Sequence, residues 1–172
     1  LEETAFLAGG ESAVTTLAIF VKTPGLSPVK TRLQATIGPE LAFEFYRITC
    51  QIVEEAAEAV PELATFWAVA EQEGLQRWST FPAVHQGEGD LGARLEYAYG
   101  RLIDQGPAML VGADCPAITS AILVRAMNAL READFVIGPA EDGGYYLFGG
   151  RKPIASAIWR GVTYSTADTY RQ

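Results

Sequence analysis

The sequence has few of the features that mark secreted, membrane or nucleic-acid-binding proteins. Its two cysteines, Cys50 and Cys115, form no Cys-x-x-Cys pair, which excludes a disulfide framework and a cysteine zinc site. No apolar run reaches the length of a membrane span. The net charge of −8 argues against binding to nucleic acid or to an anionic membrane. The cysteine usage favours a reducing, cytoplasmic location.

Two well-known nucleotide-binding loops are also missing from the sequence. No Gly-x-Gly-x-x-Gly stretch occurs, so a nicotinamide-type dinucleotide site is unsupported. The segment from Gly25 to Thr31 does not match a phosphate-binding loop, because Val29 stands where that loop needs glycine before its lysine. The single histidine, His85, has no serine or cysteine visibly paired with it. Any nucleotide site must therefore be built differently.

The chain does contain apolar runs that alternate with amphipathic helices. The runs predict strands over residues 17–22, 65–70, 82–86, 108–113, 134–140 and 145–149. Helices are expected to begin at Gly38-Pro39, after Asp90 and after Thr119. In the first of these helices, Leu41, Phe45 and Ile48 mark the expected buried face. This alternation is typical of an α/β domain with three layers, α/β/α, and a mostly parallel sheet.

The same pattern sets the expected domain organisation. Residues 17–172 read as a single domain, and residues 1–16 read as an N-terminal extension or a tag-derived segment. Little chain remains after the sixth run to finish the sheet. We therefore expect that a C-terminal segment is missing.

Charged side chains follow three of the predicted strands. They are Lys22, Lys30 and Arg32 in "KTPGLSPVKTRL", Asp114 in "LVGADCP", and Glu141 and Asp142 in "EDGG". Because the carboxyl ends of parallel strands meet at one edge of a sheet, these groups are expected to converge. Such a set suits Mg²⁺ or Mn²⁺ bridging a diphosphate. Alternatively, the cations are solvated, Asp114 ends a strand before Pro116, and Asp142-Gly143 is a hairpin turn.

Two further segments are candidates for the same site. In "QGEGDLGARL", Asp90 and Arg94 flank a helix N-terminus that could receive an anion, the alternative being a helix cap and a solvated arginine. Gly143 and Gly144 would let the backbone approach a ligand closely. The next two residues, Tyr145 and Tyr146, could line an acceptor pocket, unless one of them belongs to the core.

Four motifs together resemble one bacterial family. "FVKTPGLSPVKTRL", "QGEGDLGARL", "LVGADCPAI" and "VIGPAEDGGYYLFG" occur in the order and spacing of small glycosyltransferase-like proteins. That family is described as a domain of unknown function or as transferases associated with radical-SAM or selenium genes. It belongs to the nucleotide-diphospho-sugar transferase superfamily, which has the Rossmann-like GT-A fold. The resemblance runs from about Leu17 to about Arg171.

The resemblance implies roles for individual residues. The loop from Lys22 to Arg32 would hold the nucleotide and its phosphates, above all through Lys30 and Arg32. Asp114 would stand where the superfamily has its metal-binding aspartate. The usual Asp-x-Asp signature is not reproduced, because Gly112 and Pro116 flank Asp114, so Asp142 is expected to supply the second carboxylate.

The resemblance also leaves three functions open. The first is metal-dependent transfer of a sugar from a nucleotide sugar to a small-molecule acceptor, with Glu141 as the base. The second is nucleotidyl transfer from a nucleoside triphosphate with release of pyrophosphate. The third is a non-catalytic module that binds nucleotide sugars.

Overall fold

A computed structural model describes residues 14–172 of the chain. The strands are β1 (Thr15–Val21), β2 (Leu63–Val69), β3 (Ala83–His85), β4 (Ala108–Gly112), β5 (Phe135–Pro139) and β6 (Tyr145–Gly150). The helices are α1 (Thr31–Ile37), α2 (Pro39–Glu58), α3 (Leu91–Ile103), α4 (Ser120–Ala129) and α5 (Ser156–Gly161), with short 3-10 helices η1 (Gln72–Arg77) and η2 (Thr169–Arg171). The expectation for residues 1–13 lies outside the described part, and β1 begins two residues earlier than predicted.

The strands form one six-stranded sheet in the order β3-β2-β1-β4-β6-β5. The first four strands of that order pair in parallel, and β6 runs antiparallel between β4 and β5. The turn between β5 and β6 is too short for a crossover helix, so the chain must reverse there. The predicted α/β fold with a mostly parallel sheet is confirmed.

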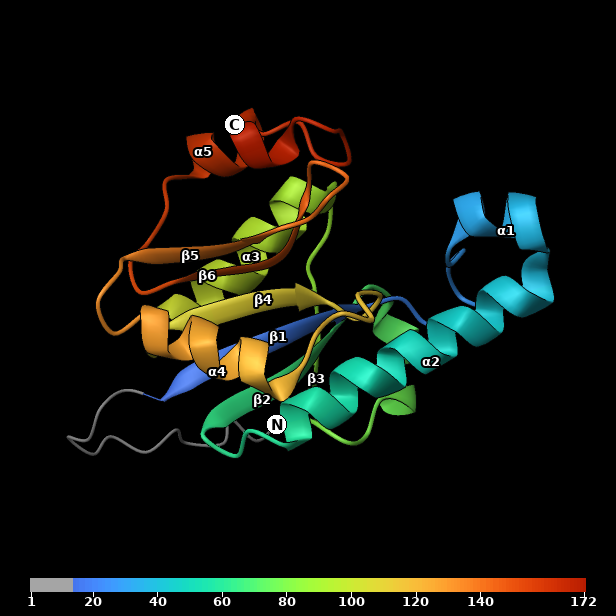
Figure 1. Cartoon of the computed structure of the whole chain (residues 1–172), viewed down its shortest axis with the longest axis horizontal. Helices are drawn as coiled ribbons and strands as arrows, with labels where there is room; N and C mark the ends of the chain where they lie inside the picture. The colour runs from blue at the N-terminus through green and yellow to red at the C-terminus, as the bar shows by residue number, and fades with distance from the viewer. Residues whose placement is uncertain (1–13) are drawn as a thin grey trace.

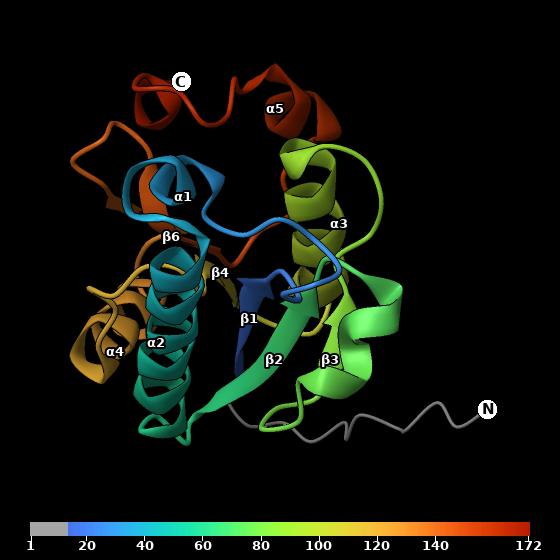
Figure 2. The same ribbon diagram turned by 90° about the vertical axis from the view of Figure 1, so that its right-hand side faces the viewer.

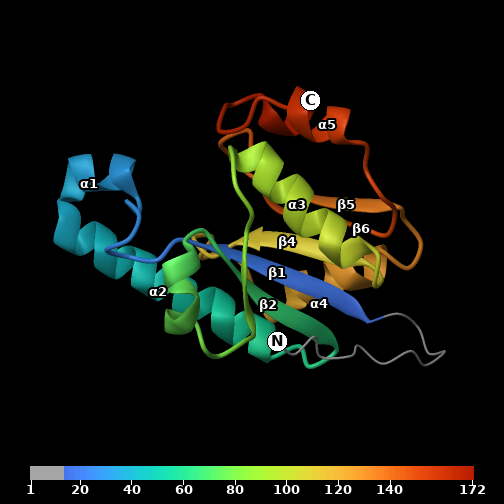
Figure 3. The same cartoon turned by 180° about the vertical axis from the view of Figure 1, so that it is seen from behind.

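Helices cover both faces of this sheet (Figures 1 and 3). On β1, Leu17, Ile19 and Val21 belong to the core cluster shared with α2 and α4. The intervening Ala18 belongs to the second cluster, which includes Tyr99 of α3 and Trp159 of α5. Because successive strand side chains point to opposite faces, an all-apolar strand fills two cores at once.

The buried face of α2 differs from the predicted one. Leu41, Phe45 and Ile48 are exposed, and Leu41 is the most accessible of them at 63%. The residues of α2 that are buried are instead mostly smaller ones: Ala42, Tyr46, Thr49, Cys50, Val53, Ala56 and Ala57. The prediction was wrong because the N-terminal half of α2 extends past the sheet edge (Figure 1), where apolar side chains have no strand to cover.

Helix α1 was also not predicted, since residues 22–32 were expected to form a loop. It has seven residues and none of them is buried, so it carries no amphipathic pattern to detect. It lies beside the start of α2 at the carboxyl edge of the parallel strands, the edge that Figure 2 faces. Among the described helices, none is long and apolar enough to cross a membrane.

Candidate active site

The topology brings the three charged segments to one edge of the sheet. Strands β1, β4 and β5 run in the same direction and end there, and β6 starts there. The segments that follow β1 and β4 are immediate neighbours, because these two strands pair directly. The segment after β5 is separated from β4 by β6. The edge is therefore shared, but the "EDGG" turn lies further along it.

Lys30 and Asp114 form the central contact of this edge. The Lys30 ammonium lies 3.1 Å from Asp114 Oδ2 and 3.3 Å from the Asp114 carbonyl oxygen. The Lys30 side chain is 21% exposed, whereas that of Asp114 is 56% exposed. The pair therefore places one fixed cation and one accessible carboxylate side by side.

The backbone at Lys30 adopts a conformation that lysine rarely takes. Its φ of 49° and ψ of 41° lie in the left-handed region, where a non-glycine residue is strained by about 1–3 kcal/mol. The neighbouring Val29 is buried and anchors the turn. The ammonium also lies 5.4 Å from the centre of the Phe45 ring. These contacts hold the cation over the end of β4 instead of leaving it to solvent.

The first residues of the same loop are held by side chains that the sequence did not single out. The hydroxyl of Tyr46 accepts a hydrogen bond from the Lys22 N–H and donates one to the Lys22 carbonyl, both at 2.9 Å. The Glu71 carboxylate accepts from the Thr23 N–H at 2.7 Å, and the Trp78 indole donates to the Thr23 hydroxyl at 3.0 Å. Burial, followed by the nearby Cys50 thiol, raises the pKa of Tyr46, so its hydroxyl stays protonated.

Gln86 fixes the end of the neighbouring strands. It is buried, and its amide nitrogen donates to the carbonyl oxygens of Val21 at 3.0 Å and Ala68 at 2.7 Å. These bonds tie the ends of β1 and β2 to the segment after β3. No signal in the sequence indicates this role, because the predicted strand over 82–86 has Gln86 as its last residue, whereas β3 ends at His85. The other two basic residues of the loop, Lys22 and Arg32, are exposed and form no ion pair with a described residue.

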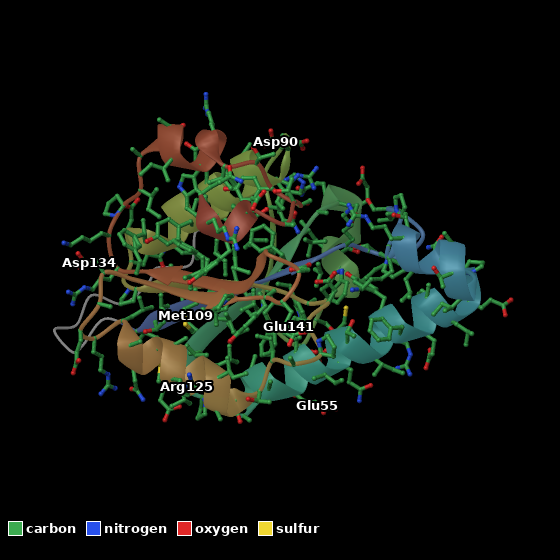
Figure 4. All side chains as sticks on the ribbon, turned by 45° about the horizontal axis from the view of Figure 1, so that its top comes forward. Glu55, Asp90, Met109, Arg125, Asp134 and Glu141 are labelled. Atoms are coloured by element: carbon green, nitrogen blue, oxygen red, sulfur yellow. The ribbon has the colours of Figure 1, made fainter. Side chains whose placement is uncertain are left out.

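The turn between β5 and β6 is ordered by its own backbone and by the C-terminal segment. Asp142 Oδ1 accepts a hydrogen bond from the Gly144 N–H at 3.0 Å, as in the turn alternative. The Gly143 carbonyl accepts from the Tyr170 N–H at 2.8 Å. Glu141 is exposed, and no hydrogen bond or ion pair within residues 14–172 joins it or Asp142 to Asp114. Figure 4 labels Glu141 on this turn and Asp134 at the opposite end of β5.

Asp90 and Arg94 have structural partners at the start of α3. Asp90 Oδ1 accepts from the Ala93 N–H at 2.9 Å and so caps the helix. Arg94 Nε donates to the Gly89 carbonyl at 2.9 Å and so holds the loop that precedes α3. Burial, together with the charges of Asp90 and Glu96, raises the pKa of the nearby Tyr164. The two side chains thus shape this loop, and their phosphate contacts stay a prediction.

Tyr145 and Tyr146 point to opposite faces of the sheet. Tyr146 packs against the core shared with α2 and α4, where its ring fills the space above Gly138. Tyr145 lies on the other face, 6.3 Å from Phe148 between ring centres. Burial, with the adjacent Tyr164 phenol, raises the pKa of Tyr145. Tyr146 therefore belongs to the core, and Tyr145 is the better candidate to meet a ligand.

The residues present constrain how a divalent cation could bind. Across residues 14–172, no group of three or more His, Cys, Asp or Glu side chains is arranged to hold a metal ion. Mg²⁺ in phosphate sites often takes only one or two carboxylates and completes its shell with substrate phosphates and water. The accessible carboxylate of Asp114 suits that shared mode. The described residues thus fit a cation that arrives with phosphates, and they form no group of metal ligands by themselves.

The fold is that of nucleotide-diphospho-sugar transferases. A crystal structure of a "putative nucleotide-diphospho-sugar transferase" from Desulfovibrio desulfuricans G20 superimposes with a TM-score of 0.81 at 28% sequence identity, covering 92% of this chain and 73% of that one. The 4-diphosphocytidyl-2C-methyl-D-erythritol synthase of Anaerococcus prevotii DSM 20548 shares the fold at a TM-score of 0.56 and 12% identity, over 88% of this chain and 77% of that one.

Sequence comparison then identifies the family. Residues 48–166 match the family described as "Uncharacterized protein conserved in bacteria (DUF2064)", and the chain belongs to it. None of the curated proteins is significantly similar to this chain in sequence. The association with radical-SAM or selenium genes stays a prediction.

Proposed function

We propose that this protein is a transferase that binds a nucleotide diphosphate-sugar at the carboxyl edge of its sheet and passes the sugar to a small-molecule acceptor. The observation that carries the proposal is the Lys30–Asp114 pair, which holds a cation and an accessible carboxylate where β1 and β4 end. Ligands of open α/β sheets bind at this edge. The fold shared with the Desulfovibrio protein supports the same class of substrate.

Lys30 is assigned to the diphosphate. Its ammonium is fixed by Asp114 and by its backbone, so it would meet a phosphate oxygen with little loss of side-chain entropy. Arg32, exposed on α1, and Lys22 would contribute further positive charge. Preorganised cations stabilise the charge that develops on a leaving nucleoside diphosphate, and one such contact accounts for about a hundredfold or more in rate.

Asp114 would hold Mg²⁺ or Mn²⁺ together with the substrate phosphates. When bound, the cation supplies further neutralisation of the leaving diphosphate. Asp142 is assigned as the second carboxylate of the same site. Its Oδ1 is engaged by the Gly144 N–H, so Oδ2 is the atom left for this role.

The acceptor is assigned to the side of the β5–β6 turn. The acceptor hydroxyl oxygen would form a bond to the anomeric carbon while the bond from that carbon to the diphosphate breaks, and Glu141 would take the hydroxyl proton. Glu141 is exposed at the turn, and Tyr145 lies on the following strand. Gly143 and Gly144 let the turn backbone lie close to the acceptor.

Nucleotidyl transfer is the alternative on the same fold, because the same lysine and aspartate could stabilise a pyrophosphate leaving group. A non-catalytic module that binds nucleotide sugars is the third possibility. The decisive experiment is a thermal-shift panel of nucleoside triphosphates and nucleotide sugars, each with and without Mn²⁺. Stabilisation followed by release of nucleoside diphosphate supports sugar transfer, and release of pyrophosphate supports nucleotidyl transfer. Binding without either product indicates the module, and no stabilisation at all contradicts every version.

A further inference from the structure

A cavity of about 510 Å³ lies between α2 and the segment that contains η1. Its walls include residues of α2 from Phe43 to Glu58 and the segment from Arg77 to Thr80. Lys30, Asp114 and Asp142 are not among the lining residues. The volume lies within the range typical of small-molecule sites.

The aromatic part of this cavity consists of rings that pack on one another, and one of its indole N–H groups has no hydrogen-bond partner in the described part of the chain. Trp67 packs against Trp78 at 4.9 Å and against Phe81 at 5.4 Å between ring centres, with tilted planes. These rings are tilted against one another and are not arranged as parallel plates that would stack on a nucleobase. Trp67 is only 1% exposed, and its indole N–H has no hydrogen-bond partner in the described part of the chain.

The charged groups of the cavity disfavour an anionic ligand. Glu54, Glu55 and Glu58 of α2 line it (Glu55 is labelled in Figure 4). Arg47 is already held by two hydrogen bonds to Glu44, and Arg77 donates to the Pro24 carbonyl at 3.1 Å. The carboxylates thus outnumber the free cations, so a phosphate or carboxylate ligand would be repelled.

The polar groups that line the cavity are instead suited to bind hydroxyl groups. Glu54 and Glu55 already accept hydrogen bonds from neutral donors, Thr80 and Gln51, and each carboxylate has further acceptor capacity. Ser79, which is exposed, offers a hydroxyl donor in the same walls. A hydroxyl group both donates and accepts, whereas an ammonium only donates. We propose that this cavity is a second binding site, for a neutral polyhydroxyl ligand of the monosaccharide or cyclitol class.

An occupant of the cavity would contact the residues that position the phosphate loop. Tyr46 binds the backbone of Lys22, and Trp78 and Arg77 bind the next two residues of that loop. All three side chains line the cavity. This second site therefore adjoins the proposed nucleotide site through the loop, while its polar groups are separate from it.

The test uses intrinsic tryptophan fluorescence, to which Trp67 and Trp78 contribute at the cavity and Trp159 contributes from the other core cluster. The protein is titrated with D-glucose, D-mannose, N-acetyl-D-glucosamine and myo-inositol, with choline and uridine as contrasting ligand classes. We expect a saturable change in tryptophan emission with at least one of the first four. The Glu55→Ala/Glu58→Ala double variant should bind that ligand about tenfold more weakly or worse. Glu40→Ala, on the same helix outside the cavity, should bind it as the parent does.

Several results would overturn this assignment. They are a lack of saturation with all four polyhydroxyl ligands, a response to choline or uridine alone, and equal weakening in the Glu40→Ala control. Melting curves of the variants should show that they are folded, because all three glutamates are exposed. The Lys30→Met variant should keep the fluorescence response. If the parent protein binds none of the nucleotides but still binds the sugar, the proposed function fails and the second site stands.

Discussion

The ammonium of Lys30 lies 3.1 Å from Asp114 Oδ2, although 84 positions separate the two residues in the chain. The pairing of β1 with β4 makes this contact possible, because it brings the segments that follow both strands together. The pair is partly exposed, so its contribution to stability is small, about 0–1 kcal/mol. The pair matters because it fixes the position of one positive charge at the carboxyl edge of the sheet.

Lys30→Met should weaken nucleotide binding and turnover much more than stability. The variant keeps the length of the side chain and removes the charge that faces the diphosphate. We expect turnover to fall about a hundredfold or more, with a small change in melting temperature. Lys152→Met is a matched control, because Lys152 pairs with Asp134 at the other end of β5. Equal losses in the two variants would contradict the role of Lys30.

The two aspartates assigned to the cation can be separated by their metal dependence. Asp114→Asn should abolish the extra thermal stabilisation that Mn²⁺ adds to a bound nucleotide. Asp142→Asn should reduce it, since Asp142 has only one unengaged oxygen. Calorimetric titration of Mn²⁺ in the presence of nucleotide measures both effects. If the Mn²⁺ dependence is unchanged in Asp114→Asn, Asp114 has no part in cation binding and serves only as a turn residue that holds Lys30.

Asp90 can be examined as a cap and as a ligand contact at once. Asp90→Ala removes the acceptor for the Ala93 N–H and should lower the free energy of unfolding by about 1 kcal/mol. Asp90→Asn keeps a capping oxygen and removes the charge. If Asp90 contacts the nucleotide, Asp90→Asn weakens binding at nearly unchanged stability, as denaturant unfolding and nucleotide titration will show. Nucleotide affinity unchanged from that of the parent protein in both variants would leave Asp90 with the capping role alone.

Gly143→Ala should disrupt the β5–β6 turn and the C-terminal segment that covers it. Gly143 has a φ of +84°, and an added Cβ would lie 1.8 Å from the Ala167 carbonyl oxygen. The backbone strain alone costs about 1–3 kcal/mol, and the overlap adds to it. Gly100→Ala is the control, because its Cβ meets nothing and a helix-interior alanine stabilises by about 0.5–1 kcal/mol. Melting temperatures should therefore move in opposite directions.

The two cysteines should differ in their reactivity with iodoacetamide. Burial raises the pKa of Cys50 to about 11, so at pH 8 only about one thiol in a thousand is the reactive thiolate. Cys115, which is partly exposed, should be alkylated first. Labelling of Cys50 should increase as the pH approaches 11 or when the protein unfolds. Mass spectrometry of the labelled peptides measures the order, and early labelling of Cys50 in the folded protein would contradict its burial.

The fold could be largely predicted because strand and helix periodicity are local properties. Apolar runs and caps such as Asp90 and Thr119 appear directly in the sequence, and both caps form in the structure. Helix α1 could not be predicted, because a seven-residue helix without buried residues has no periodic signal. The face of α2 was misjudged for a related reason. Hydrophobicity marks Leu41 and Phe45, but only the position of the sheet edge decides which residues are covered.

By itself, the sequence determined the class of fold and the edge at which the charged segments meet. Both follow from chain direction: parallel strands end together, and a short turn after β5 must reverse the chain. Only the tertiary structure decided the partners. It paired Lys30 with Asp114, held the loop by Tyr46 and Gln86, and placed Tyr146 in the core. Such contacts join residues far apart in the chain, so their distances depend on how helices and strands pack and not on any local pattern.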